Sequence, residues 1–152
     1  PMFKVNAERA FLTLTSPAFE NGATIPQKYT AQGENINPPL SVTGVPEGTA
    51  SLVIIVDDPV FPLMIWNHWI IWNVPSNGMI AENTTVGVQG RNSWRENNYG
   101  GLDPPFGTHS YYFKVYALDI TLNLSSDATK SDVLRAMDNH VLAKAELVGK
   151  YW

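Results

Sequence analysis

The segment PPFGTHSYYFKVYALD, residues 104–119, is the stretch on which the fold prediction depends. Its two prolines fix the backbone and lack an N–H group, and Gly107 permits a sharp change of direction. Aromatic and β-branched residues then predict a long strand at residues 110–122. Side chains alternate along a strand, so His109 and Tyr111 share one face. Two titratable side chains therefore stand at the start of an otherwise apolar face.

Two further segments supply polar groups at strand ends. Residues 53–59, VIIVDDP, form a strand of the buried type that runs into Asp58 and a proline. Residues 66–72, WNHWIIW, begin another strand with His68 between tryptophans. A few polar groups at the mouth of an apolar face are typical of small-ligand sites. We therefore expect Asp58 and His68 to lie near His109 and Tyr111.

Composition limits the class of protein. The 152 residues are 44% hydrophobic and 16% charged, which predicts one globular domain over residues 1–152. A net charge of −4 argues against nucleic-acid binding. The absence of cysteine excludes disulfides, thiolate catalysis and cysteine zinc sites, and it fits a reducing compartment. With no visible signal peptide and no apolar run of about 20 residues, we expect a cytoplasmic protein without a membrane span.

The order of elements predicts a mainly β fold. Strands are expected at 11–15, 40–42, 51–57, 69–74 and 110–122, with loops at 59–67 and 76–107. The Asn21-Gly22 pair fits a tight hairpin. A capping box at Thr129 and Asp132 begins a helix, which the four-residue spacing of Val133, Met137 and Val141 continues towards a stop at Gly149. Several strands and late helices indicate a β-sandwich or barrel with one or two peripheral helices.

Four motifs together carry a family resemblance. They are Asp58-Pro59-Val60-Phe61-Pro62, His68-Trp69, Pro104-Pro105-x-Gly107-x-His109-x-Tyr111 and Tyr116-Ala117-Leu118-Asp119. With these motifs the chain resembles the phosphatidylethanolamine-binding protein (PEBP) family, in its short bacterial and archaeal branch, from about Leu14 to Tyr151. The resemblance implies a β-sandwich whose central antiparallel sheet is flanked by a second sheet, with small helices near the C-terminus.

The resemblance also implies a ligand site. Residues Asp58, His68, Pro105, His109 and Tyr111 would line a pocket for a small anion, such as phosphate or a phosphoethanolamine-like head group. Histidine N–H and tyrosine O–H groups are suitable donors, and affinity should rise as the pH falls because histidine titrates near neutrality. The family usually has a second aspartate where Val60 stands and a basic residue where Ser110 stands, so the preferred ligand remains open.

Structural roles are the alternative for each site residue. His109 and Tyr111 could be a core pair, His68 a packed strand residue and Asp58 a turn-former before proline. A hydrolase is disfavoured, because there is no Gly-x-Ser-x-Gly motif and Ser110 points away from its neighbour His109. The spacing of the aspartates and histidines also fits no common metal site.

The first hypothesis is therefore a non-enzymatic binding and regulatory protein with no catalytic residue, metal or cofactor. The family resemblance suggests a second, an inhibitor of serine proteases acting through loops at 59–67 or 85–100. A small hydrolase or metal enzyme is a third. A homodimer is also expected to be possible, because short family members lack the C-terminal extension that covers the pocket region in longer ones.

Overall fold

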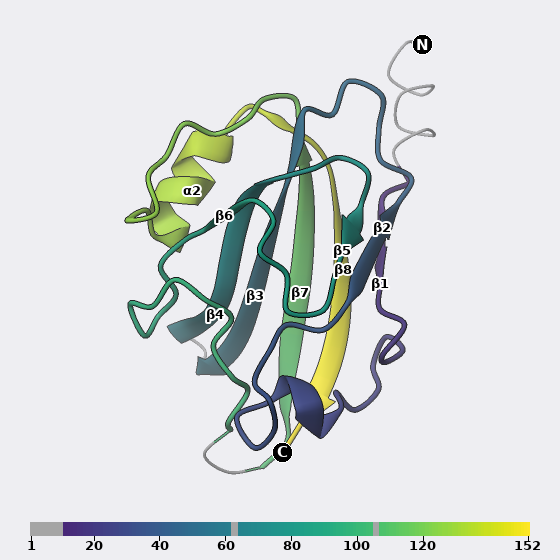
Figure 1. The fold of residues 1–152 in the computed structure, drawn as a ribbon, viewed down its shortest axis with the longest axis vertical. Coiled ribbons are helices and arrows are strands. Elements are labelled where there is room, and N and C mark those ends of the chain that lie inside the picture. Colours follow the sequence, from purple (N-terminus) through teal and green to yellow (C-terminus); the bar gives the residue numbers. More distant parts are fainter. Residues whose placement is uncertain (1–10, 62–63, 105–106) are drawn as a thin grey trace.

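Two antiparallel sheets form the molecule. The computed structural model describes residues 11–61, 64–104 and 107–152, apart from the side chains of residues 60 and 61. The smaller sheet has the order β1 (Thr13–Thr15), β2 (Leu40–Thr43), β5 (Met79–Ile80). The larger has the order β6 (Val88–Gln89), β4 (Met64–Val74), β3 (Ser51–Phe61), β7 (His109–Leu118), β8 (Val141–Tyr151), as Figure 1 shows. The expected mainly β fold is thus confirmed.

Strand β3 lies at the centre of the larger sheet and is apolar on both faces. Leu52, Ile54 and Val56 pack into the core between the two sheets, whereas Val53 and Ile55 pack into a second core. The second core lies under the helix α2 (Lys130–Met137), which contributes the buried residues Val133 and Met137. A run of consecutive apolar residues is what a strand covered on both faces requires.

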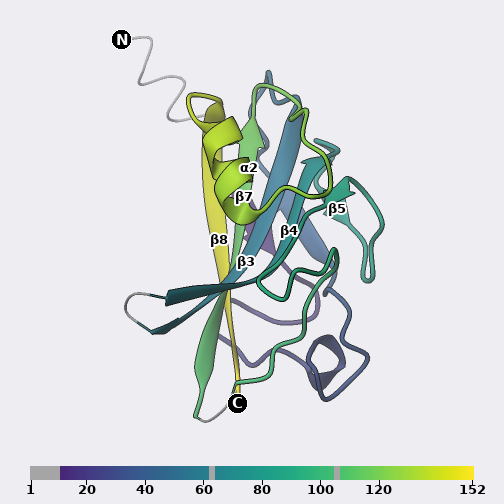
Figure 2. The ribbon, with the colours of Figure 1, turned by 90° about the vertical axis from the view of Figure 1, so that its left-hand side faces the viewer.

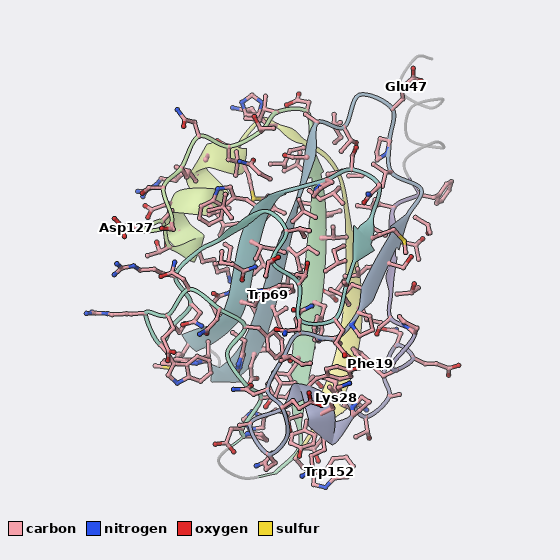
Figure 3. The ribbon with its side chains drawn as sticks, in the orientation of Figure 1. Phe19, Lys28, Glu47, Trp69, Asp127 and Trp152 are labelled. Carbon is pink, nitrogen blue, oxygen red and sulfur yellow. The ribbon has the colours of Figure 1, made fainter. Side chains whose placement is uncertain are left out.

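Aromatic side chains fill much of the core between the sheets. Trp69 is only 1% exposed, and Phe19 packs against Phe113 with ring centroids 5.6 Å apart. Figure 3 shows the side chains of Trp69 and Phe19 directed inward, while those of Glu47 and Asp127 lie at the periphery. Such close packing fixes the mutual position of the two sheets.

The predicted start of α2 is confirmed. The backbone N–H of Thr129 donates to Asp132 at 2.9 Å, completing the capping box. The helix also carries an anchor at its first residue, because Lys130 donates to the buried carboxylate of Asp57 at 2.6 Å. A short 3₁₀ helix, η1 (Gln27–Tyr29), is the other helical element among the described residues.

The predicted end of that helix is wrong. The helix stops at Met137, Asn139 takes a positive φ of 67°, and Val141–Tyr151 form β8, paired with β7 along its whole length. Val141 continues the helical spacing of Val133 and Met137, but Ala143, Ala145 and Leu147 also alternate with polar residues. The segment forms a strand because it pairs with β7, and the alternation of a strand places Ala143, Ala145 and Leu147 against the core.

Two local expectations are also corrected. Residues 59–61 and 64–67 belong to strands and not to a loop: β3 continues to Phe61 and β4 begins at Met64, and the two strands project together from the body of the sheet, as Figure 2 shows. Register shifts between Val56 and Asp57 and between Asp58 and Phe61 accommodate Pro59 in this hairpin. Strand β7 begins at His109 and ends at Leu118 instead of spanning 110–122.

The Asn21-Gly22 turn is present but does not close a hairpin of its own. The N–H of Gly22 donates to the carbonyl of Val148 at 2.7 Å, and that of Ile25 donates to Lys150 at 2.8 Å. This segment therefore covers the C-terminal half of β8. The turn is used to bring residues 22–25 alongside a distant strand, which a local motif could not indicate.

Gly149, expected as a helix stop, has a packing role instead. It is buried in β8, and a Cβ there would lie 2.4 Å from Cγ1 of Ile25. Gly149→Ala should lower the free energy of unfolding by about 1–3 kcal/mol, because overpacking forces neighbours off their preferred positions. Urea denaturation measures the change, with the exposed neighbour Lys150→Ala as the control. Equal stability of the two variants would contradict this account.

Candidate functional site

Three adjacent strands bring the predicted site residues together. Asp58 is on β3, His68 on β4, and His109 and Tyr111 on β7, and these strands are neighbours in the order β4-β3-β7. The relevant strand ends all lie at the lower end of the larger sheet in Figure 1. The fifth predicted residue, Pro105, lies outside the described residues, as does the side chain of Val60.

An aspartate orients His109. Nδ1 of the ring lies 2.7 Å from Oδ2 of Asp58, and both side chains are largely buried. A carboxylate oxygen accepts hydrogen bonds, so Nδ1 carries the proton in this pair. The other ring nitrogen, Nε2, has no hydrogen bond to the part of the chain that the structure describes. A buried hydrogen bond of this length also fixes the plane of the ring.

A backbone carbonyl orients His68 in the same way. Its Nδ1 lies 3.1 Å from the carbonyl oxygen of Gly100, which can only accept. The ring meets Tyr111 edge-on at 5.3 Å and Trp94 edge-on at 5.1 Å between centroids. Burial lowers the pKa of His68 below its usual 6.5, although the Gly100 carbonyl and Asp58 act in the opposite direction. The ring is therefore mostly neutral at pH 7.

Tyr111 stands between the two histidines. Its ring centroid is 5.3 Å from that of His68 and 6.4 Å from that of His109, and the residue is fully buried. Burial, followed by the charge of Asp58, raises the pKa of Tyr111 far above its usual range, so the hydroxyl stays protonated. Among the described residues this hydroxyl has no hydrogen-bond partner. A buried donor without a hydrogen bond lowers the stability of the protein, and a ligand atom that accepts a hydrogen bond from it would remove this penalty.

Two cavities flank the site. One, of about 360 Å³, is lined by Asp58, Pro59, Thr108, His109, Ser110 and Tyr112. The other, of about 370 Å³, lies beside Gly100 and has Trp94, Tyr99 and Asp103 in its walls. Each touches part of the cluster: the first reaches the Asp58–His109 pair, and the second reaches the carbonyl that holds His68.

Ser110 has a basic neighbour on the next strand. By the alternation of side chains along β7 it belongs to the face opposite His109, and its cross-strand partner in β8 is Lys150. Directly opposed residues in an antiparallel pair have Cβ atoms about 4.5–5.5 Å apart. An exposed cation therefore stands beside Ser110.

The role of Gly100 was not predicted. It gives a carbonyl to His68, and a Cβ at this position would lie 2.4 Å from the ring of Trp94. Trp94 in turn packs against Trp66 with centroids 5.3 Å apart. The Gly100-Gly101 pair is visible in the sequence, but a backbone acceptor leaves no side-chain signal. Within the described residues, no group of three histidine, aspartate or glutamate side chains is placed to hold a metal ion.

Comparison with known proteins identifies the family. The model of the family described as phosphatidylethanolamine-binding protein matches residues 15–152. A UPF0098 protein of Methanothermobacter thermautotrophicus is 45% identical over 148 residues, covering 92% of this chain and 98% of that protein. A UPF0098 protein of Chlamydia trachomatis is 44% identical over 147 residues, covering 92% of this chain and 98% of the relative.

Solved structures agree with the sequence matches. The crystal structure of a putative PEBP homologue from Chlamydia trachomatis superposes with a TM-score of 0.89 at 43% identity, over 94% of this chain and 98% of that one. The structure of Escherichia coli YbcL, described as a member of the mammalian PEBP family, has a TM-score of 0.84 at 29% identity, over 92% and 97%. The chain belongs to the phosphatidylethanolamine-binding protein family, in the bacterial and archaeal branch that includes the UPF0098 proteins. The predicted resemblance is confirmed.

No helix among the described residues is long and apolar enough to cross a membrane.

The buried hydroxyl of Tyr111 leads to a prediction about the free energy of unfolding. Tyr111→Phe removes a buried polar group that has no partner within residues 11–61, 64–104 and 107–152, so the ligand-free protein should keep or gain stability, by up to about 1–3 kcal/mol. Tyr99→Phe is the matched control, because its hydroxyl donates to the carbonyl of Tyr29 at 2.8 Å and its loss should destabilise by about 1–3 kcal/mol. Urea denaturation compares the two. Equal destabilisation would show that the Tyr111 hydroxyl has a partner in the free protein.

Proposed function

We propose that this protein binds the phosphate group of a small anionic ligand, such as phosphoethanolamine, and acts as a binding protein without catalysis. The observation that carries the proposal is the buried hydroxyl of Tyr111, which lies between two oriented histidines and has no hydrogen-bond partner in the part of the chain that the structure describes. Phosphate oxygens accept hydrogen bonds, and a tyrosine O–H and a protonated histidine are donors of the right kind. The family description, phosphatidylethanolamine-binding protein, names a ligand whose head group also contains a phosphate.

The arrangement supports binding better than catalysis. A hydrolase would need a nucleophile within reach of a base. Ser110, the hydroxyl adjacent to His109 in sequence, belongs to the opposite face of β7, and the ring nitrogen that faces Asp58 is already bonded. The histidines are oriented by acceptors, which suits a preformed recognition site. In this proposal, occupancy of the site regulates a partner protein.

The test is an NMR titration of labelled protein with inorganic phosphate and with phosphoethanolamine at pH 6. Saturable shifts at His68, His109 and Tyr111 are expected in the wild type. His109→Gln and Tyr111→Phe should each weaken binding by about tenfold or more, as expected for loss of a charge-assisted or buried hydrogen bond.

His140→Gln is the matched control. Nδ1 of His140 lies 2.8 Å from Asp119 in an exposed histidine–aspartate pair far along β7 from the site. Its replacement should leave binding unchanged. Absence of saturable shifts at millimolar ligand, or equal loss in the His140 variant, would reject phosphate binding at this site.

A second candidate function is inhibition of a serine protease through the β3–β4 hairpin. The hairpin projects from the body of the sheet (Figure 2), and Met64 and Ile65 on it are 48% and 55% exposed. Apolar side chains on a protruding segment are suited to a partner's cleft. This function would survive Tyr111→Phe and would be lost in Met64→Asp, which an inhibition assay against a panel of serine proteases distinguishes.

A further inference from the structure

The hydrogen bonds that orient the two histidines also fix which ring nitrogen carries the proton. A carbonyl oxygen holds Nδ1 of His68, and a carboxylate oxygen holds Nδ1 of His109. Both partners are acceptors, so in the neutral form of each ring the proton is on Nδ1. The remaining nitrogen, Nε2, then presents a lone pair. Each neutral histidine is thus a hydrogen-bond acceptor towards a ligand.

Two neutral histidines that present acceptor nitrogens do not suit a phosphate group without a proton. A fully ionised phosphomonoester, or a phosphodiester at any pH near neutrality, offers only acceptor oxygens. Two acceptors cannot form a hydrogen bond unless a proton is placed between them. The hydroxyl of Tyr111 supplies one donor, but the Nε2 atoms of the neutral rings supply none.

His68 is the ring that resists protonation. Burial lowers its pKa, and the groups that act against burial are the carbonyls of Gly100 and Gly101 and the carboxylates of Asp57 and Asp58. Tyr111 and Trp94, which contact the ring edge-on, bring no charge, because the tyrosine stays protonated. His68 therefore remains an acceptor at neutral pH.

His109 differs because its partner is charged. The ring is bonded to Asp58, Tyr111 lies beside it on β7, and Tyr151 is its cross-strand neighbour on β8. The charged residue opposite Ser110, Lys150, is on the other face of the sheet. When His109 is protonated, its pair with Asp58 is electrically neutral overall and Nε2–H becomes a donor. When it is not protonated, the pair keeps the negative charge of Asp58 next to the ligand.

We infer that the site selects a phosphate that still carries a proton, namely the singly ionised form of a phosphomonoester, over a phosphodiester. This inference rests on the proposed function. The P–OH group donates to Nε2 of His68, while the ionised oxygens accept from Tyr111 and from protonated His109. A soluble monoester such as phosphoethanolamine meets this requirement, whereas the phosphodiester of an intact phospholipid has no P–OH to donate.

The test compares methyl phosphate with dimethyl phosphate by NMR and calorimetric titration at pH 6. The second ionisation of a phosphomonoester has a pKa of about 6, so about half of the methyl phosphate carries the proton there. Methyl phosphate should bind at least about tenfold more tightly than dimethyl phosphate, and its affinity should fall as the pH rises to 8. Equal affinities for the two ligands in the wild type would overturn the inference while leaving phosphate binding intact. If neither ligand binds, the proposed function itself fails.

The variant His68→Gln tests whether His68 is responsible for the preference for a phosphomonoester over a phosphodiester. Its side-chain amide offers either a carbonyl oxygen or an N–H₂ group, so it can donate to a diester oxygen. The preference for the monoester should shrink to within about threefold in this variant and stay at about tenfold in His140→Gln. A preference unchanged by His68→Gln would overturn the inference.

A second measurement needs no variant. Long-range nitrogen–proton NMR spectra of the wild-type complex report whether Nε2 of His68 carries a proton. An unprotonated Nε2 in the methyl phosphate complex at pH 6 is the expected result. A doubly protonated His68 ring would show that the protein supplies the proton and would overturn the inference.

Discussion

Strand β3 is buried on both faces, and the rest of the structure is arranged around that burial. Residues 52–56 are fully buried, with even-numbered side chains towards the smaller sheet and odd-numbered ones towards α2. The same alternation continues into two aspartates. Asp57 accepts from Lys130 at 2.6 Å and from Lys114 at 3.4 Å, whereas Asp58 accepts from His109. Buried carboxylates require such partners, so one strand determines where both the helix anchor and the site must lie.

The family and the mainly β class could be predicted from the sequence because both depend on strong local patterns. The cluster of Asp58, His68, His109 and Tyr111 was also predictable, since each stands at the end of a segment with an unambiguous strand pattern. Two limits remain. Gly100 contributes a backbone atom, which has no signature in the sequence, and Pro105 lies outside the described residues.

The errors arose where local periodicity was ambiguous. Residues 141–151 contain apolar positions that fit a continuation of α2 and others that fit a strand. Only the long edge of β7, more than twenty residues away in the sequence, selects the second pattern. The prolines in residues 59–67 similarly suggested a loop, but Pro59 lies within β3, where register shifts in the β3–β4 pair accommodate it. In both places non-local pairing prevails over local preference.

The two histidines of the site are oriented by acceptors of different charge. The acceptor is a neutral carbonyl for His68 and a carboxylate for His109. Burial lowers the pKa of His68 below its usual value, although the Gly100 carbonyl acts in the opposite direction, whereas His109 is bonded to the carboxylate of Asp58. Tyr111, with its pKa raised by burial, stays a donor across the physiological range. The cluster therefore combines a hydroxyl donor with histidine rings whose Nδ1 atoms are held by acceptors.

The two consecutive aspartates have a consequence for how this chain can change during evolution. Asp57 and Asp58 lie on opposite faces of one strand, because the alternation of side chains along β3 continues into them and its pairing with β7 is regular as far as Asp57. Inserting or deleting a single residue before them would exchange the faces of both carboxylates at once. The helix anchor and the candidate site would then be disrupted together, although they share no atom. Homologues are therefore expected to differ in length within loops such as residues 76–87, while the spacing from Ser51 to Asp58 stays constant.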